Sequence, residues 1–507
     1  MLWGLRFNGL MTRSISRRFF LCSAAGALVA PAAYAAPPTQ SLRPVLRDDD
    51  FFRKAIPTSA ELIAKANLNG EVAYAVADVE DGIVLEQRSG AQGMAPASVA
   101  KAITALYALD ALGADHRFET RLIATGGITD GEVQGDLVLV GGADPTLDTD
   151  TLAQMAADLK DAGIRAVKGD FKVYDANLPL QSVIDAAQPD HVSYNPAVAG
   201  IALNFNRVHF EWKRGSDGYA VTMDGRSEKY RPAVAMAAMQ VQDRSAPLYA
   251  YRDGGSRDNW SVAQPFLGSG GSRWLPVRKP GLYAGDIFAT LAGAHGIRLR
   301  GLGLTDTVPA GDTVVTHTSA PLRDIMQDML KYSTNLTAEM VGLSATIARG
   351  GTPTSLKQSA GMMNAWAASN LGMGSAAFVD HSGLGEDSRI SARDMVAALV
   401  RMHGSQTLKP ILKTVVMRDG KRRPMPDHPV RVEAKTGTLN FVSGLAGYMT
   451  TPEGRVMAFA IFAGDMPRRA TLTRAQRERP DGGRAWNVRA KRLQQDLIER
   501  WAAYYVE

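Results

Sequence analysis

Ser98-Val99-Ala100-Lys101 lies at the start of a strong helical pattern that covers residues 96–112 without a breaker and stops at Gly113. A spacing of three residues places the Ser98 and Lys101 side chains on one face of that helix. A serine hydroxyl needs an adjacent base to act as a nucleophile, and a lysine amine is such a base when burial and positive neighbours lower its pKa. The quartet therefore predicts a serine nucleophile activated by a lysine, although Ser-x-x-Lys alone occurs by chance in most long proteins.

Two further motifs follow in the chain. Ser333-Thr334-Asn335 lies near the middle of a helical pattern over residues 321–347. Lys435-Thr436-Gly437-Thr438 comes directly before a final predicted hairpin over residues 444–463. The order of the three motifs, with one hairpin (71–87) before them and one after, argues against coincidence.

The Lys-Thr-Gly motif suits an edge strand beside a nucleophile. Gly437 would let a substrate backbone approach closely and pair as an added strand. The Lys435 ammonium and the hydroxyls of Thr436 and Thr438 could hold a terminal carboxylate.

Together these motifs resemble the signature of penicillin-binding proteins and serine β-lactamases. The interval from Ser98 to Ser333 is 235 residues (333 − 98), which is too long for a compact helical subdomain and predicts inserted domains. Gly141 to Leu147 and Asp380-His381-Ser382-Gly383-Leu384 add to the likeness, with His381 in place of a glycine. On these residues the chain resembles the D-alanyl-D-alanine carboxypeptidase/endopeptidase family, the penicillin-binding protein 4 type of class C low-molecular-mass penicillin-binding proteins (peptidase family S13).

The resemblance implies an α/β (α+β) fold. Its core would be a serine β-lactamase/transpeptidase-like domain with an antiparallel sheet flanked by helices, and two nested strand-rich domains would be inserted in it. The expected boundaries are 50–113 with 319–507 for the penicillin-binding domain, 114–175 with 265–318 for the first insertion, and 176–264 for the nested one.

The resemblance also implies a role for each motif residue. Ser98 would attack the carbonyl of the penultimate D-alanine and Lys101 would take its proton. Ser333 would relay a proton to the leaving amine, and Asn335 would hold a substrate amide. The oxyanion would lie between the backbone N–H groups of Ser98 and Thr438.

The same resemblance sets the expected partners. Lys435 would recognise the carboxylate of the substrate, and the substrate would be a stem peptide of peptidoglycan, with β-lactam antibiotics as inhibitors. Neither a metal nor an organic cofactor is needed. The oligomeric state stays open.

One departure from the family pattern concerns the substrate side chain. The family commonly continues Asp-Gly-Ser-Gly-Leu with Ser-Arg, whose arginine helps to bind a diaminopimelate side chain, whereas this chain has Gly385-Glu386 there. Arg389 is the candidate replacement, and Asp175 is the candidate contact for the amine, although a turn aspartate is an equally good interpretation of Asp175. We expect activity to depend less on a free diaminopimelate terminus than the family pattern implies.

Composition and the N-terminus indicate an exported protein. Ser16-Arg17-Arg18-Phe19-Phe20-Leu21 is typical of a twin-arginine signal, and cleavage is expected after Ala35, so that residues 1–35 are a signal peptide and the mature enzyme is periplasmic. The mature chain would contain no cysteine and would carry only +2 (53 − 51), which gives no electrostatic case for binding nucleic acid. Export by the general route, and a start at Met11 rather than Met1, stay open.

Two other kinds of protein share part of this pattern. A β-lactamase shares the three motifs, but no Glu-x-x-Leu-Asn segment is present and the long insertion is foreign to such compact enzymes. A non-catalytic sensor of β-lactams or peptidoglycan would have no need of Lys101.

The arginine-rich stretch over residues 468–484, between the last predicted strand and the last predicted helix, is interpreted as a solvated loop.

Overall fold

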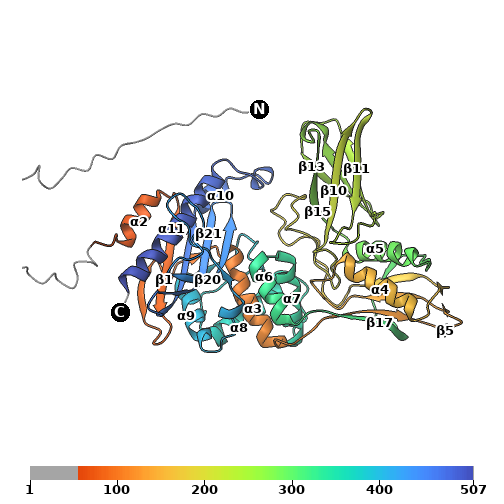
Figure 1. The fold of residues 1–507 in the computed structure, drawn as a ribbon, viewed down its shortest axis with the longest axis horizontal. Coiled ribbons are helices and arrows are strands. Elements are labelled where there is room, and N and C mark those ends of the chain that lie inside the picture. The colour runs from red at the N-terminus through yellow and green to blue at the C-terminus, as the bar shows by residue number, and fades with distance from the viewer. Residues whose placement is uncertain (1–54, 506–507) are drawn as a thin grey trace, which may run out of the picture. The chain divides into compact units, whose positions relative to one another are not determined.

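A six-stranded sheet forms the core of the region that carries the three motifs (Figure 1). The computed structural model describes residues 55–505, so the predicted signal peptide lies outside the described residues. All neighbouring strands of the sheet are antiparallel. Their order is β19 (Lys413–Thr414), β20 (Arg431–Leu439), β21 (Val442–Thr450), β22 (Val456–Gly464), β1 (Glu71–Asp78) and β2 (Val84–Arg88).

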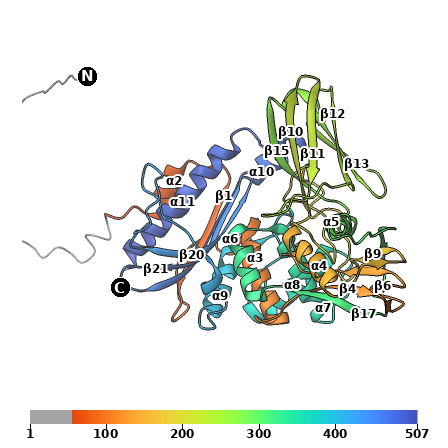
Figure 2. The same cartoon turned by 45° about the vertical axis from the view of Figure 1, so that its right-hand side comes forward.

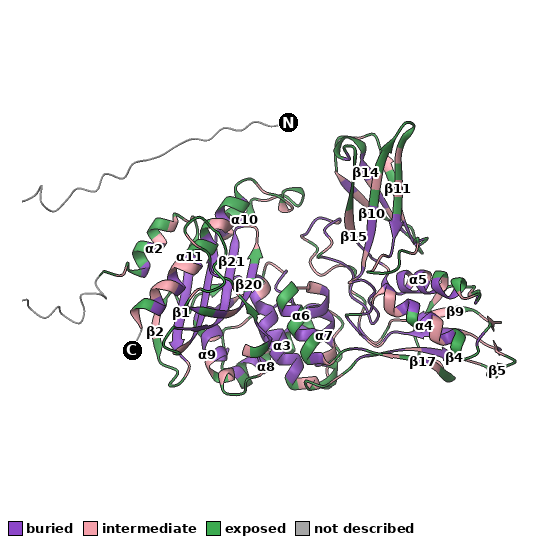
Figure 3. Ribbon diagram, viewed as in Figure 1, coloured by how far each residue is buried: buried purple, intermediate pink, exposed green. Residues whose placement is uncertain are grey.

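Helices cover both faces of this sheet because its strands are apolar on both sides. On β1, Ala73 and Ala75 face a core shared with α3 (Ala100–Leu112) and α9 (Ala392–His403). The alternate residues Val72, Tyr74 and Val76 face a second core shared with α2 (Ser59–Ala66) and α11 (Gly483–Tyr504). Figure 2 shows α11 lying along the sheet, and Figure 3 shows the buried strands beneath it.

Helix α3 is the centre of a helical cluster that contains α6 (Leu322–Tyr332), α7 (Asn335–Ala348) and α8 (Leu356–Leu371). The first ten residues of α3 are all buried, which explains why its sequence is apolar all round instead of amphipathic. A short 3₁₀ turn, Ala97–Val99, precedes α3. The expectation of one helical pattern over 321–347 was wrong, because the chain breaks between α6 and α7.

A five-stranded sheet lies within the long interval between the first two motifs. Helices α4 (Thr149–Asp161) and α5 (Pro280–Ala294) pack on it in a separate core. The sequence patterns predicted a strand-rich insertion and did not predict these two helices. The strand order is β16 (Gly303–Thr305), β9 (Phe171–Tyr174), β7 (Leu137–Val140), β4 (Glu119–Ala124) and β17 (Asp312–Thr318).

Smaller sheets complete the interval. One pairs β11 (Gly218–Asp224), β10 (Arg207–Gly215) and β15 (Gly270–Pro276), and another pairs β12 (Ala237–Gln242), β14 (Asp258–Ala263) and β13 (Tyr249–Asp253). Two minor sheets contain β5 (Ile128–Thr129), β6 (Glu132–Val133) and β8 (Ala166–Val167), and β18 (Ile390–Ser391) and β3 (Gly93–Met94). The predicted domain boundaries stay a prediction. Within residues 55–505, none of the helices is long and apolar enough to cross a membrane.

Candidate active site

Ser98 lies in the 3₁₀ turn that leads into α3. The preceding residue, Ala97, has a positive φ of 46°, which is unusual for a residue with a side chain and turns the backbone sharply just before Ser98. Gly383 packs directly against this turn, since a Cβ on Gly383 would lie 1.9 Å from the Ala97 carbonyl oxygen. The position of Ser98 therefore depends on a strained turn that a second loop supports.

Lys101 is completely buried one turn further along α3. Its Nζ donates hydrogen bonds to Ser98 Oγ at 3.0 Å, to Asn335 Oδ1 at 2.7 Å and to the Ser382 carbonyl at 2.7 Å. Burial lowers the pKa of Lys101 to about 8, against the opposing effect of two buried carboxylates. A lysine with this pKa is partly neutral near pH 8 and can accept the proton of Ser98.

The Ser-x-Asn motif forms the turn between α6 and α7. Ser333 ends α6 in a left-handed conformation with φ of 62°, and Asn335 begins α7. Besides binding Lys101, Asn335 donates from Nδ2 to the Tyr194 carbonyl at 2.9 Å. The motif therefore projects from a turn toward α3. Ser, Thr and Asn are common at helix ends, so the residues of the motif could have indicated a break between two helices here.

Lys435 lies on β20 and donates from Nζ to Ser333 Oγ at 2.9 Å. It is buried, and burial together with the charge of Lys101 lowers its pKa to about 6. The Lys-Thr-Gly motif is thus joined to the Ser-x-Asn motif by a direct hydrogen bond. The Ser-x-x-Lys motif is joined to the same Ser-x-Asn motif by the hydrogen bond from Lys101 to Asn335.

Strand β20 has a free edge beside this cluster. Its outer neighbour β19 pairs only with Glu433 and Ala434, so no strand within residues 55–505 pairs with the edge from Lys435 to Leu439. Thr436 and Thr438 are exposed there. The Lys-Thr-Gly motif therefore lies on a strand edge as expected, while β19 pairs with the residues of β20 that precede it.

Gly437 also lies against the turn that carries Ser98. A Cβ at this position would lie 2.6 Å from the Pro96 carbonyl oxygen and 3.1 Å from the Ser98 amide nitrogen. The glycine therefore lets β20 approach the Ser98 turn, and the predicted approach of a substrate backbone at the strand edge stays a prediction.

A cavity of about 330 Å³ opens beside these groups. Ser98, Ser333, Asn335 and Thr438 line one part of it. The rest of the lining was not predicted from the sequence and comes from four regions of the chain: Gln188, Tyr194, Gly383, Leu384, Leu439, Asn440, Arg469, Arg477, Glu478 and Asn487.

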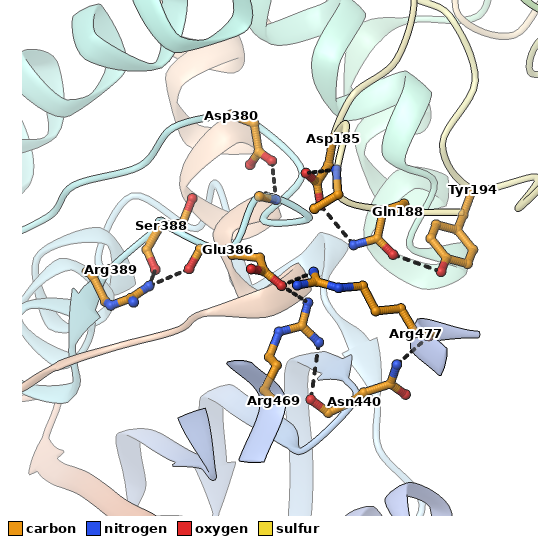
Figure 4. A network of polar contacts seen from close by, with 12 residues as sticks. Asp185, Gln188, Tyr194, Asp380, Glu386, Ser388, Arg389, Asn440, Arg469 and Arg477 are labelled. Atoms are coloured by element: carbon orange, nitrogen blue, oxygen red, sulfur yellow. Dashed lines mark hydrogen bonds and ion pairs between the residues drawn. The ribbon is translucent and has the colours of Figure 1, made fainter. Parts of the chain in front are cut away.

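Two arginines that line this cavity converge on Glu386 (Figure 4). Arg469, on α10 (Met466–Ala470), reaches its carboxylate at 3.1 Å, and Arg477, on a 3₁₀ turn (Ala475–Arg477), makes a second, shorter contact. The interpretation of residues 468–484 as a solvated loop was wrong here, because the Arg469 side chain is only 3% exposed. Arg469 and Arg477 of this segment are thus paired with the half-buried carboxylate of Glu386.

The two candidate contacts for the substrate side chain lie elsewhere. Arg389 donates to the carbonyls of Glu386 and Ser388 and lines a different cavity, of about 200 Å³. Asp175 accepts a hydrogen bond from the Gly281 amide in the first turn of α5, and burial raises its pKa. The structure brings neither of them to the cavity beside Ser98, and it favours the structural interpretation of Asp175.

The segment after α10 also binds the inserted region. Arg474 pairs with Asp190 at 2.7 Å, and Glu478 pairs with His191 at 2.7 Å and with Arg273 at 2.8 Å. The hydrogen bond from His191 holds the pKa of Glu478 at about 2. These ion pairs place inserted residues at the rim of the cavity, which no local sequence signal could have shown.

Comparison with known proteins agrees with this geometry. Residues 58–483 match the model of the D-Ala-D-Ala carboxypeptidase 3 (S13) family. The chain is 31% identical over 421 residues to a D-alanyl-D-alanine carboxypeptidase of an Actinomadura species, over 76% of each chain. It is 24% identical over 435 residues to one from Haemophilus influenzae, over 80% of this chain and 89% of the other.

Solved structures support the fold. Penicillin-binding protein 4 of Haemophilus influenzae matches with a TM-score of 0.69 at 21% identity, over 88% of this chain and 100% of that one. A structure of the same protein in complex with a β-lactam matches with a TM-score of 0.68 at 22% identity. The predicted α/β fold class is confirmed.

Proposed function

The chain belongs to the D-Ala-D-Ala carboxypeptidase 3 (S13) family, and from this premise we propose that it cleaves D-Ala-D-Ala termini, D-Ala–diaminopimelate cross-links of peptidoglycan, or both, through an acyl-enzyme on Ser98. The carboxypeptidase class of enzyme that the motifs predicted is confirmed by this membership. The observation that carries the acyl-enzyme proposal is the hydrogen bond from buried Lys101 Nζ to Oγ of Ser98, which lines the cavity.

In the first step, neutral Lys101 accepts the Ser98 proton while Ser98 Oγ attacks the carbonyl carbon of the penultimate D-alanine. The oxyanion forms between the backbone N–H groups of Ser98 and Thr438, and loss of one such donor costs about 3–4 kcal/mol in comparable sites. Ser333, linked to Lys435, passes a proton to the leaving amine. Water then hydrolyses the ester and regenerates Ser98.

The free edge of β20 supports binding of the peptide as an added strand. Its terminal carboxylate would lie near Lys435, Thr436 and Thr438, where the cation and the hydroxyls can bind it. Asn335 would bind a substrate amide. The acyl part of the peptide would then run toward Asn440 and Arg477 at the other part of the cavity.

The experiment is labelling and hydrolysis with the Ser98→Ala variant. We expect it to lose covalent benzylpenicillin labelling and D-Ala-D-Ala hydrolysis while its circular dichroism spectrum stays that of the wild type. Ser344→Ala, on α7 and outside the cavity, is the matched control and should keep both activities. A stable penicillin adduct on the Ser98→Ala protein would show that another residue is the nucleophile.

Mass analysis of purified cross-linked muropeptides digested by the wild-type enzyme tests the endopeptidase part. Release of uncross-linked products supports it, and loss of terminal D-alanine alone would restrict the enzyme to carboxypeptidase activity. Stoichiometric penicillin labelling without any peptide hydrolysis would favour the sensor alternative, and rapid penicillin turnover the β-lactamase alternative.

We also propose that the β-lactam class inhibits this enzyme and that the mature protein acts in the periplasm. The first proposal is supported by the β-lactam complex of a protein with the same fold. The second is supported by the twin-arginine pattern at Arg17-Arg18 and by the cleavage site at Ala35. Fractionation of cells that express the full chain, before and after substitution of Arg17 and Arg18 by lysine, tests the export route.

A further inference from the structure

Two buried carboxylates fix the loop behind Lys101. Glu339, on α7, accepts hydrogen bonds from the amides of His381 at 3.0 Å and Ser382 at 2.8 Å, one on each oxygen. Asp380 accepts from the amides of Gly383 at 2.7 Å and Gly385 at 2.6 Å. Every polar atom of both carboxylates is therefore used to hold the backbone of residues 381–385.

The loop held in this way binds the catalytic lysine. The Ser382 carbonyl accepts a hydrogen bond from Lys101 Nζ at 2.7 Å, and the neighbouring His381 carbonyl accepts one from Thr104 at 2.6 Å. The Ser382 amide is bound by Glu339 and its carbonyl by Lys101, so one residue joins the two charged groups.

We propose that Glu339 is a positioning residue of the catalytic centre, which fixes the Ser382 carbonyl against Lys101 and balances the charge of Lys101 with its own. This inference rests on the proposed acylation of Ser98. Glu339 is 0% exposed and touches neither the cavity nor Ser98 directly, so it acts on the reaction only through Lys101 and the loop.

The surrounding charges explain why a carboxylate is required here. Burial and the charge of Asp380 raise the pKa of Glu339, while the hydrogen bonds from Ser382 and His381 and the charge of Lys101 lower it and favour the charged carboxylate. Burial also raises the pKa of Asp380, and the negative charge of Asp185 raises it further. On the other side lies Lys435, and burial and the charge of Lys101 lower the pKa of its amine. Buried His381 has its pKa lowered to about 3, so it stays neutral and cannot replace Lys101 as a counter-charge.

A purely structural role would require only a group that binds the two amides. An amide side chain accepts with its oxygen alone and turns its N–H₂ toward the second amide, so glutamine at this position loses one of the two bonds and the charge. Aspartate keeps the negative charge, but its side chain is one methylene shorter and holds the two amides less well. Comparing the two variants therefore separates the electrostatic contribution from the geometric one.

The experiment measures benzylpenicillin acylation of the full mature chain between pH 6 and pH 10. For Glu339→Gln we expect the rate to fall on the order of tenfold to a hundredfold, because Lys101 loses its anchor. We also expect the acidic limb of the profile to move to lower pH by roughly half a unit or more, because a negative charge that favours protonated Lys101 is gone. For Glu339→Asp we expect a lower rate with the limb at its wild-type position.

Asp258→Asn is the matched control, since Asp258 is equally buried and also accepts a backbone amide bond, from Arg278, but lies on β14. It should leave the limb unchanged. The inference is overturned if Glu339→Gln keeps the wild-type limb, or if Glu339→Asp moves it as far as Glu339→Gln does. If Glu339→Gln does not fold, a limb in Glu339→Asp that moves to lower pH overturns the inference equally. A failure of the underlying acylation would look different, because the wild type would then not be labelled at all.

Discussion

The base that would activate Ser98 has no exposed atom, so its titration is set by the protein interior. Burial lowers the pKa of Lys101 to about 8, and the neutral fraction of the amine therefore rises as the pH passes through about 8. We expect the rate of benzylpenicillin acylation to rise with pH over this range, in stopped-flow or gel-based labelling assays. A rate that is constant from pH 6 to pH 9 would contradict the assignment of Lys101 as the base.

His381 stands where the family pattern has glycine, and a glycine on the neighbouring helix makes room for it. A Cβ on Gly342 would lie 2.2 Å from the His381 ring. We expect Gly342→Ala to destabilise the fold by about 1–3 kcal/mol, as overpacking does in other cores. In a His381→Gly background the same change should be neutral or stabilising, because alanine favours a helix by about 1 kcal/mol over glycine.

A double-mutant cycle by urea denaturation measures this coupling. Additive effects of the two substitutions would show that Gly342 and His381 do not depend on each other. At the scale of single residues, the sequence therefore indicated the departure at His381 but not its compensation, because the two positions are 39 residues apart (381 − 342) and meet only in the folded protein.

At the scale of elements, local patterns predicted most of what local forces determine. The helix at Ser98, the hairpin after Gly437 and the C-terminal helix were all recognised from spacing and turn residues. The break at Ser333 was missed, since the apolar spacing of α6 continues into α7 and only the left-handed residue between them interrupts it. The folded turn after α10 was missed because its arginines are stabilised by Glu386, a partner from another element.

The arginines of the segment that begins with α10 change the expected preference for the side-chain carboxylate of the substrate. The expectation of a weak dependence on the side-chain carboxylate considered Glu386 alone, whereas two guanidinium groups against one carboxylate leave one positive charge at that end of the cavity. We therefore expect a carboxylate on the acyl side of the peptide to be preferred over a carboxamide. Arg477→Gln should reduce this preference in kcat/KM by about tenfold, within the range for a charged hydrogen bond.

Matched peptide pairs that differ only in this group measure the preference, and Arg389→Ala is the control. Since Arg389 lines a different cavity, its loss should leave the preference unchanged. A preference that persists in Arg477→Gln and disappears in Arg389→Ala would contradict the placement of the cation.

At the scale of the whole chain, the spacing of the motifs was enough to infer an insertion, because 235 residues cannot fit between two helices of one small subdomain. It could not show that the insertion contributes to the cavity. Asn335 binds the Tyr194 carbonyl, and Arg474 binds Asp190, across separations of 141 and 284 residues. Such contacts depend on the register of two distant segments, and neither segment carries a local pattern that indicates it.

The ion pairs of Glu478 with His191 and Arg273 join these distant segments, and they should respond to acid. The pKa of Glu478 is about 2 in the folded protein, below its ordinary value near 4.5, so its contribution to stability is present above pH 4.5 and is lost as the pH falls toward 2. Because Glu478 is only half-buried, we expect that contribution to be about 1 kcal/mol. The wild type should therefore have a higher Tm than Glu478→Gln at pH 6, and the difference should shrink between pH 4.5 and pH 2. Glu453→Gln, in the exposed turn between β21 and β22, is the control and should show no such dependence. A Tm difference between the wild type and Glu478→Gln that stays constant down to pH 2 would show that Glu478 stabilises the fold by packing alone, and the contacts between the insertion and the segment after α10 would then be independent of charge.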